Sequence, residues 1–283
     1  MKLYKLSAEI ILQYNNGNYL IQNHWDALIN REGLYNYLEE IVPELPVLTE
    51  AMASAHINEG LLPPIGKQEV WAAGVTYLRS REARMEESAD SGAADLYDKV
   101  YEAERPELFF KALPHRVAGH NQQVYIRRDS AWNVPEPEMT LFINSNGNIQ
   151  GYTIGNDMSS RSIEGENALY LPQAKIYERS AALGPCLYVA EQPVSLDTSI
   201  KMSISRNGSE VYCDGTTIGR MKRTFPELVG YLYRECDFPD GTFLMTGTCL
   251  VPGNDFTLQE NDVVSISIDT IGTLVNTISF KPI

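Results

Sequence analysis

Glu136, Glu138 and Asp157 are the residues of this 283-residue chain whose types and spacing best suit chemistry. Glu136 and Glu138 are two positions apart, so on a β-strand their side chains point to the same face of the sheet. If Asp157 lies opposite Glu136 on the next strand, three carboxylates converge, and like charges that close are destabilising unless something neutralises them. Hard oxygen ligands in this arrangement suit a divalent cation, Mg²⁺, Mn²⁺ or Ca²⁺. The alternative is that they are solvated acidic residues at the ends of a hairpin.

The sequence between these acids indicates the hairpin that brings them together. Asn146-Gly147 favours a two-residue type I′ turn, and strand-like runs flank it on both sides, Met139–Ile143 and Ile149–Ile154. With Ser145 opposite Asn148, counting outward along both strands places Glu136 directly opposite Asp157. Cβ atoms of facing residues are about 4.5–5.5 Å apart. The register therefore predicts a cluster of three carboxylates on one face.

An anionic substrate needs cations, because the chain as a whole is acidic. The formal net charge is −14, which argues against nucleic acid or an anionic membrane as a partner. Singly, each candidate cation is more often a surface residue, but together with the acids they could grip a metal ion and an oxyacid at once: Arg79 or Arg81, Lys111, Arg161 and Lys175. We expect an extended segment to restart around Lys175, in LPQAKIY. Thr246-Gly247-Thr248 follows a predicted strand, where backbone amides and hydroxyls could bind a carboxylate.

The cysteines and the N-terminus bear on the compartment. Four cysteines are widely scattered and show no CxxC spacing, which favours reduced thiols in a cytoplasmic protein over a disulfide framework or a zinc site. The apolar run in MKLYKLSAEIILQY is too short for a signal peptide, and no segment is expected to span a bilayer.

Short strands separated by Gly, Pro and Asn dominate the pattern and predict a β-rich α+β fold, not a doubly wound parallel sheet. Residues 1–66 are expected to form a smaller N-terminal domain that ends at the connector Leu62–Gly66, followed by a catalytic domain at 67–283. A charged amphipathic helix is predicted over Arg79–Glu104 and another helix over Phe225–Cys236. Further predicted strands are Trp71–Val75, Leu108–Ala112 and Ser199–Arg206, the last before a second hairpin signal at Asn207-Gly208.

Several motifs together resemble the fumarylacetoacetate hydrolase superfamily over roughly residues 70–283: E-P-E, GYTIGNDMSSR, LPQAKIY and TGT. The metal site of that family, Glu-x-Glu on one strand and Asp on a later one, corresponds to Glu136, Glu138 and Asp157. Longer segments look most similar to the 2-keto-3-deoxy-D-arabinonate dehydratase branch, namely RSREAR, ERPELFFKA, VPEPE and IEGENALYLPQAKIY.

The resemblance implies a mixed β-roll that assembles as a homodimer or homotetramer. It also implies Mg²⁺-dependent removal of water from a 2-keto-3-deoxy sugar acid, a small anionic 2-oxo acid and most simply a pentonate, to give a 2,5-dioxo acid. Chelation of the substrate's carboxylate and 2-oxo oxygens would acidify the proton on C3 and stabilise the enolate.

The other site residues are assigned from their charge and position. Lys175 is the first choice to hold the oxyanion or move the proton, because a lysine near other cations can have a depressed pKa. Arg161 and Thr248 would hold the substrate carboxylate. The remaining candidates are Ser80, Arg79 and Glu82 for the distal hydroxyls, Lys111 and Tyr77 as further substrate contacts, and Glu164 and Glu166 for the acid that assists hydroxide departure.

Two departures from the family pattern bear on the reaction. Ser162 stands where the family commonly has the Asp of S-x-R-D. Hydrolases and decarboxylases of the family carry a motif like NYxxHxxE, and alignment on Tyr77 places Ser80 at the His position and Ala83 at the Glu position, next to Glu82. An acylpyruvate or fumarylpyruvate hydrolase, or an oxaloacetate decarboxylase, of the same fold is therefore the alternative enzyme. A non-catalytic protein that binds divalent metal is the alternative of another class.

Overall fold

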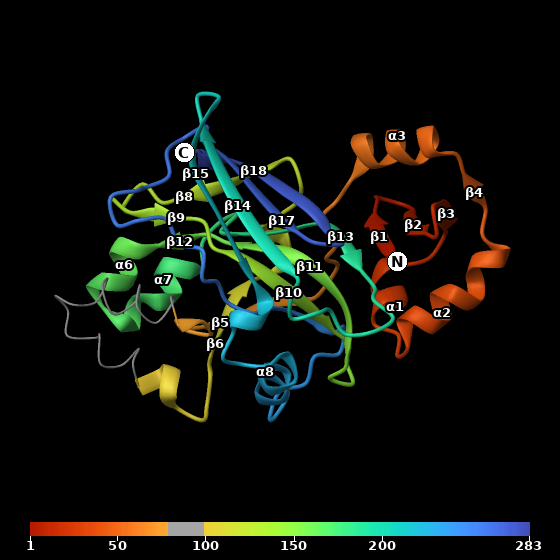
Figure 1. The fold of residues 1–283 in the computed structure, drawn as a ribbon, viewed down its shortest axis with the longest axis horizontal. Coiled ribbons are helices and arrows are strands. Elements are labelled where there is room, and N and C mark those ends of the chain that lie inside the picture. Colours follow the sequence, from red (N-terminus) through yellow and green to blue (C-terminus); the bar gives the residue numbers. More distant parts are fainter. Residues whose placement is uncertain (79–98) are drawn as a thin grey trace.

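The computed structural model describes residues 1–78 and 99–283, which form a β-rich α+β structure, as predicted. One sheet of eleven strands runs in the order β4-β3-β2-β1-β13-β11-β10-β16-β5-β6, with β7 beside β13 (Figure 1). Its strands are β1 (Lys2–Lys5), β2 (Ile10–Tyr14), β3 (Gly17–Ile21), β4 (Val47–Leu48), β5 (Glu69–Gly74), β6 (Glu107–Ala112), β7 (Val117–Ala118), β10 (Pro137–Ile143), β11 (Ile149–Asp157), β13 (Ala181–Tyr188) and β16 (Thr242–Met245).

A five-stranded sheet packs against one face of the large sheet, and a two-stranded sheet continues the β10–β11 pair beyond its end. The five-stranded order is β15-β14-β17-β18-β8, and the strands are β8 (Gln122–Ile126), β14 (Ser199–Arg206), β15 (Ser209–Thr217), β17 (Val263–Ile268) and β18 (Gly272–Phe280). The pair β9 (Asn133–Val134) and β12 (Ser159–Ser160) forms the small sheet.

The α-helices that the structure describes in full are short. They are α1 (Trp25–Ile29), α2 (Leu34–Ile41), α3 (Glu50–Gly60), α6 (Arg161–Glu166), α7 (Leu171–Lys175) and α8 (Phe225–Leu232), with 3₁₀ turns at η1 (Val42–Glu44), η2 (Pro114–Arg116), η3 (Ala168–Tyr170) and η4 (Ile218–Arg220). Thr224 and Glu227 form a capping box at the start of α8, where the helix was predicted to begin. In the described part of the chain no helix has both the length and the apolar character needed to cross a membrane.

The residues before β5 share the large sheet with the rest of the chain. β1 pairs antiparallel with β13, Leu3 opposite Leu187, so β1–β4 extend the sheet at one end, beside α1–α3 (Figure 1). The boundary proposed after residue 66 falls between α3 and β5 and stays a prediction.

The strand β10 is buried on both faces, which explains its nearly continuous apolar sequence. Met139, Leu141 and Ile143 contribute to the core shared with the five-stranded sheet. Phe142 points the other way and joins the core that α1 and α2 cover. By the same alternation, the side chain of Glu138 points to the same face of the sheet as that of Phe142. The carboxylate of Glu138 therefore lies on the face of β10 that α1 and α2 cover farther along the strand.

The turn between β10 and β11 differs from the predicted one, although the register at the acidic end agrees. Gly147 N–H donates to Asn144 O at 2.9 Å and Asn144 N–H donates to Asn148 O at 3.0 Å, so the loop has three residues, not two. The predicted type I′ turn, with Ser145 paired to Asn148, is therefore wrong. A register shift after Phe142 offsets the extra loop residue, and Glu138 pairs with Gly155, as counting along the strands predicted.

Candidate active site

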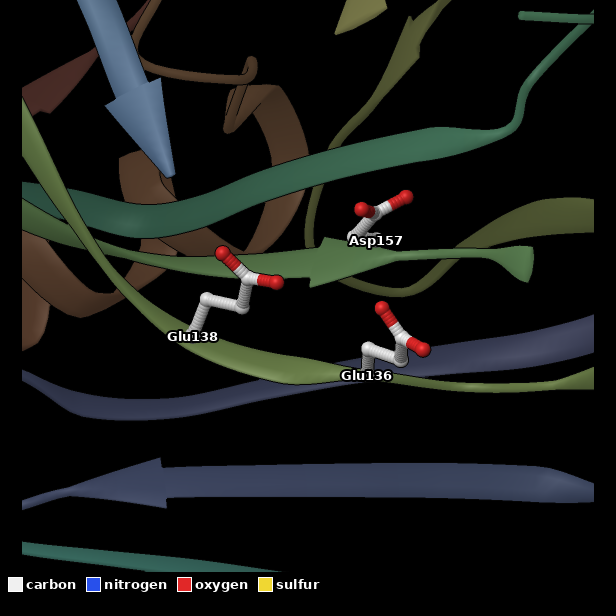
Figure 2. A group of neighbouring side chains, drawn as sticks. All are labelled: Glu136, Glu138 and Asp157. Atoms are coloured by element: carbon white, nitrogen blue, oxygen red, sulfur yellow. The ribbon is translucent and has the colours of Figure 1, made fainter. Parts of the chain in front are cut away.

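Glu136, Glu138 and Asp157 come together at one end of the β10–β11 pair. Glu136 and Asp157 exchange two backbone hydrogen bonds, of 3.2 and 2.9 Å, so they are directly opposite. One carboxylate oxygen from each of the three residues lies within 4.8 Å of those of the others. In Figure 2 Glu136 and Glu138 extend from one strand toward the neighbouring strand, which carries Asp157. All three side chains are buried, so the alternative of solvated acids at a hairpin end is wrong.

Lys175 lies among the acids. Its Nζ is 2.7 Å from Glu136 Oε2, 3.1 Å from Asp157 Oδ2 and 3.3 Å from Glu164 Oε1. The ammonium also donates to Ser159 Oγ at 2.5 Å. Lys175 is the last residue of α7, so the extended segment predicted there is wrong. Pro172 at the start of α7 suits a helical first turn, a signal that the sequence pattern contained.

Two further cations bind two of the same carboxylates, Arg161 that of Glu136 and Lys111 that of Asp157. Arg161, at the start of α6, donates through Nη2 to Glu136 Oε1 at 2.9 Å. Lys111 is completely buried; its Nζ is 2.5 Å from Asp157 Oδ1 and donates to the backbone carbonyls of Met158 and Lys175. Lys111 was predicted to contact substrate, whereas in the structure its ammonium supports Asp157 and the end of α7.

The electrostatic balance of the cluster differs between its acids. Burial, followed by the charges of Asp157 and Glu136, raises the pKa of Glu138 well above its ordinary value. Burial alone would also raise the pKa of Asp157, but the charges of Lys111 and Lys175 outweigh it and hold that pKa below its usual value. Glu138 is therefore the acid whose ionised form needs additional positive charge.

A small cavity of about 20 Å³ opens onto the carboxylates, enough for about one water-sized sphere. Among the described residues, Arg161, Lys175 and Thr248 line it together with the three acids, and the other lining residues are Ala73, Gly74, Val75, Phe109 and Gly247. Three buried carboxylates around a space of this size match the hard oxygen donors that Mg²⁺ takes in proteins. The residues present therefore fit a divalent cation.

The other predicted site residues do not all reach this cluster. Glu164 is buried beside Lys175, but Glu166 is exposed, because positions two apart on α6 do not share a face. Tyr77 is buried and lines a neighbouring hollow with Cys249 and Leu250. Ser80, Arg79 and Glu82 lie outside the described residues.

Two residues at the site were missed by sequence reasoning, Ser159 and Glu107, and a third, Gly247, lies in a segment that was predicted to bind a carboxylate. Ser159 accepts from Lys175, and its place two residues after Asp157 is the signal that could have identified it. Gly247 N–H donates to Glu138 Oε2 at 2.6 Å. The Thr246-Gly247-Thr248 segment therefore does bind a carboxylate, and that carboxylate is the protein's own Glu138. The carboxylate of Glu107 packs on the cavity residue Gly74, where an added Cβ would lie 1.9 Å from Glu107 Oε2.

Comparisons with known proteins agree with this architecture. Residues 70–279 match the family described as fumarylacetoacetate (FAA) hydrolase C-terminal. The chain is 44% identical over 256 residues to the probable 2-keto-3-deoxyxylonate dehydratase of Haloferax volcanii, covering 89% of this chain and 85% of that one. It is 43% identical over 229 residues to the 2-dehydro-3-deoxy-D-arabinonate dehydratase of Saccharolobus solfataricus, covering 79% and 76%.

A solved structure extends the likeness over the full length of both chains. It is that of 2-keto-3-deoxy-D-arabinonate dehydratase complexed with magnesium and 2,5-dioxopentanoate, with a TM-score of 0.86 and 32% sequence identity, covering 100% of each chain.

Proposed function

This chain belongs to the fumarylacetoacetate hydrolase family, and from that premise we propose that it is a Mg²⁺-dependent hydro-lyase. Its substrate is a 2-keto-3-deoxy sugar acid, with 2-keto-3-deoxy-D-arabinonate or another pentonate as first choice, and its product is 2,5-dioxopentanoate. The observation that carries the proposal is the buried cluster of Glu136, Glu138 and Asp157 with Lys175, in a chain that shares 43–44% identity with two proteins named as such dehydratases.

Glu136, Glu138 and Asp157 would hold the metal ion. Mn²⁺ and Ca²⁺ share the preference of Mg²⁺ for carboxylate oxygens, so both suit the same donors. When bound, Mg²⁺ supplies Lewis acidity and a template for the carboxylate and 2-oxo oxygens of the substrate. The additional positive charge also favours the ionised form of Glu138.

The reaction removes one proton and one hydroxyl from adjacent carbons. A base takes a proton from C3, the C–H electron pair forms the C3–C4 double bond, and the C4 hydroxyl leaves with a proton as water. Loss of a proton from C5 with protonation at C3 then moves the double bond to C4–C5 and gives an enol. The enol loses its hydroxyl proton and is protonated at C4, which gives the aldehyde of 2,5-dioxopentanoate. Substrate and product thus differ by one water.

Lys175 is placed to serve this chemistry because it lines the cavity and lies between Glu136, Asp157 and Glu164. Its ammonium would stabilise negative charge on the 2-oxo oxygen or transfer the C3 proton. Arg161 and Thr248 line the same cavity and would hold the substrate carboxylate. Glu164, which is buried, remains our candidate for the acid that assists departure of the hydroxyl. Glu166 is exposed and is therefore no longer a candidate for that role.

The distal hydroxyls of the sugar are assigned to Ser80, Arg79 and Glu82, on the basis of sequence. Hydrolysis of a carbon–carbon bond needs a water activated by a base with a pKa near the working pH, which histidine supplies and serine does not. A serine hydroxyl can instead hydrogen-bond a sugar hydroxyl. Ser80, at the position where the family's hydrolases have His, thus favours dehydration.

We further propose a homodimer or homotetramer in the cytoplasm, with no nucleic acid or membrane partner. Four free cysteines are usual in a reducing compartment, and the acidic net charge disfavours polyanionic partners. Light scattering during size-exclusion chromatography would test the assembly.

The deciding experiment compares three reactions at equal enzyme and saturating Mg²⁺. Dehydration of 2-keto-3-deoxypentonates is followed with an aldehyde dehydrogenase that oxidises the product, acylpyruvate cleavage by ultraviolet absorbance, and oxaloacetate decarboxylation by loss of the substrate. We expect dehydration to be by far the fastest. Faster acylpyruvate cleavage or decarboxylation would replace the dehydratase with one of the alternative enzymes, and metal binding without turnover would favour the non-catalytic binding protein.

A further inference from the structure

One peptide group connects Glu138 to a residue outside the carboxylate cluster. Gly247 N–H donates to Glu138 Oε2 at 2.6 Å, and the carbonyl of the same peptide, Thr246 O, accepts from Thr76 Oγ1 at 2.7 Å. Because a peptide unit is planar and rigid, the hydroxyl that binds its carbonyl also sets the direction of its N–H. Thr76 therefore influences where the Glu138 carboxylate is held.

The same peptide is anchored to β10 next to Glu138. Thr246 donates to Met139 O through both its backbone N–H, at 3.1 Å, and its hydroxyl, at 2.8 Å. These bonds fix the position of Thr246 against the strand, and the bond from Thr76 fixes the remaining rotation of the peptide plane. Thr76 and Thr246 are both fully buried, so water does not compete for these groups.

Backbone geometry after β5 brings the Thr76 hydroxyl to this point. β5 and β16 are parallel neighbours, with Ala72 opposite Met245, so the residues that follow them lie side by side. Val75 then adopts φ +54°, a left-handed conformation that is a rare outlier for a β-branched residue. Such strain persists where the surroundings impose it and is concentrated at functional sites.

Contacts on both sides of Val75 hold this turn. Its side chain packs against Val100, Tyr101 and Ala168, and Lys222 N–H donates to Thr76 O at 2.9 Å. On the facing segment, Gly247 has φ +94°, and an added Cβ would lie 2.0 Å from Thr76 Oγ1. The space that a side chain would fill at Gly247 is thus occupied by the Thr76 hydroxyl.

We propose that Thr76 is a positioning residue for the metal site: its hydroxyl orients the Thr246–Gly247 peptide, which in turn orients Glu138. The inference rests on the proposed function, since it takes Glu138 as a metal ligand. Thr76 does not line the cavity and so acts through the peptide. Groups that orient metal ligands in this way typically contribute about 10–100-fold to metal affinity.

The test is Thr76→Val, which keeps the size of the side chain and removes the donor, with Mn²⁺ affinity measured by electron paramagnetic resonance of the free ion. We expect Mn²⁺ to bind about 10–100-fold more weakly, and Thr76→Ser, which retains a hydroxyl, to bind close to wild type. Should the valine variant not fold, Thr76→Cys keeps a weak donor and is expected to bind with intermediate affinity.

Thr242→Val is the matched control. Thr242 is also fully buried, and its hydroxyl donates to Glu69 O at 3.0 Å across the same two strands, at their other end. Its loss should lower the unfolding temperature as Thr76→Val does, with unchanged Mn²⁺ affinity.

Wild-type Mn²⁺ affinity in Thr76→Val or, in its place, Thr76→Cys would overturn the inference and leave the proposed function standing. Equal weakening in Thr242→Val would also overturn it. A wild-type protein that binds no Mn²⁺ would overturn the proposed metal site and this inference with it.

Discussion

Carboxylates lie at both ends of the β10–β11 hairpin, but the groups that bind them differ. At the strand ends, Glu136, Glu138 and Asp157 are buried, and their partners include the charged groups of Arg161, Lys111 and Lys175. At the turn, the exposed Glu32 accepts from neutral amides at the loop: Asn144 Nδ2 at 2.8 Å, Asn148 Nδ2 at 3.0 Å and Asn146 Nδ2 at 3.3 Å.

The comparison distinguishes a charged cluster that suits a metal ion from a carboxylate that only binds a neighbouring loop. Neutral amides satisfy Glu32 without adding charge, and they lower its pKa, through Asn144 first and Asn148 next. In the buried cluster, burial and the charges of Asp157 and Glu136 raise the pKa of Glu138, so its ionised form needs additional positive charge. Buried charges of this kind are costly unless compensated, and a cation that binds the folded protein offsets the cost.

The largest expected effect comes from removing a proposed metal ligand. Glu138→Ala should lose Mn²⁺ binding and turn over at background rate, yet remain folded, because the mutation relieves clustered like charges. A chelator should have the same effect on the wild type, and added Mg²⁺ or Mn²⁺ should restore activity only there. Binding is measured by calorimetry and folding by circular dichroism. Full activity in the metal-free wild type would contradict the metal site.

Removing the central cation should slow the reaction by less. Lys175→Met takes away an ammonium that would act mainly in the transition state, so kcat should fall more than KM rises. One oxyanion contact is typically worth about 10²–10³-fold. Steady-state kinetics measure the effect, and binding of a pyruvate-like inhibitor checks that the site is intact. A kcat near that of wild type would show that another group stabilises the oxyanion or moves the proton.

Lys111→Met should act chiefly on stability. It leaves the buried carboxylate of Asp157 without one of its charged partners, and breaking a buried pair from one side typically costs about 3–5 kcal/mol. Urea unfolding with added chelator measures the change. The exposed Lys201 provides the control, since Lys201→Met should change stability by less than about 0.5 kcal/mol. Equal stability of the two variants would show that Lys111 does not support Asp157.

The smallest effect is expected at the other end of the hairpin. Glu32→Gln should lower stability at pH 7 by about 1 kcal/mol, because hydrogen bonds to an exposed charged group are worth little more, and it should leave activity unchanged. The folded-state pKa of Glu32 lies below its ordinary 4.5. Its contribution is therefore present above 4.5 and is lost as the pH falls from that value through the lower folded-state pKa.

Urea unfolding of the Glu32 variant and the wild type between pH 3 and 7 checks this prediction. The two stability curves should converge at the acidic end. A stability difference that grows as the pH falls would contradict the predicted sign. A loss of activity at neutral pH would show that the turn end of the hairpin also affects the reaction.

Two Asn-Gly pairs show how far local sequence determines a turn. Asn207 and Gly208 both have positive φ, and Arg206 pairs with Ser209, the two-residue hairpin that the dipeptide predicts. At Asn146-Gly147 the side chain of Asn144 accepts from the amides of Asn146 and Asn148, and a three-residue loop forms instead. Glu32, which binds the Asn144 amide, lies 112 positions away in the sequence, so the dipeptide alone could not indicate it.

The acidic end was predictable because it depends on the two-residue alternation of strands and on the pairing of adjacent ones. Both are properties of a short segment, and they place Glu136 and Glu138 on one face with Asp157 opposite. The fold class was equally readable from the short strands and their turn residues.

Contacts between segments far apart in the chain decided the rest. The contacts of Lys111 with Asp157 and with the carbonyl at the end of α7 depend on how distant elements pack. The peptide that joins Thr76 to Glu138 exists because β5 and β16 are parallel neighbours, although 170 positions separate Thr76 from Thr246. Burial sets which polar groups must find protein partners, and no local pattern specifies burial across such separations.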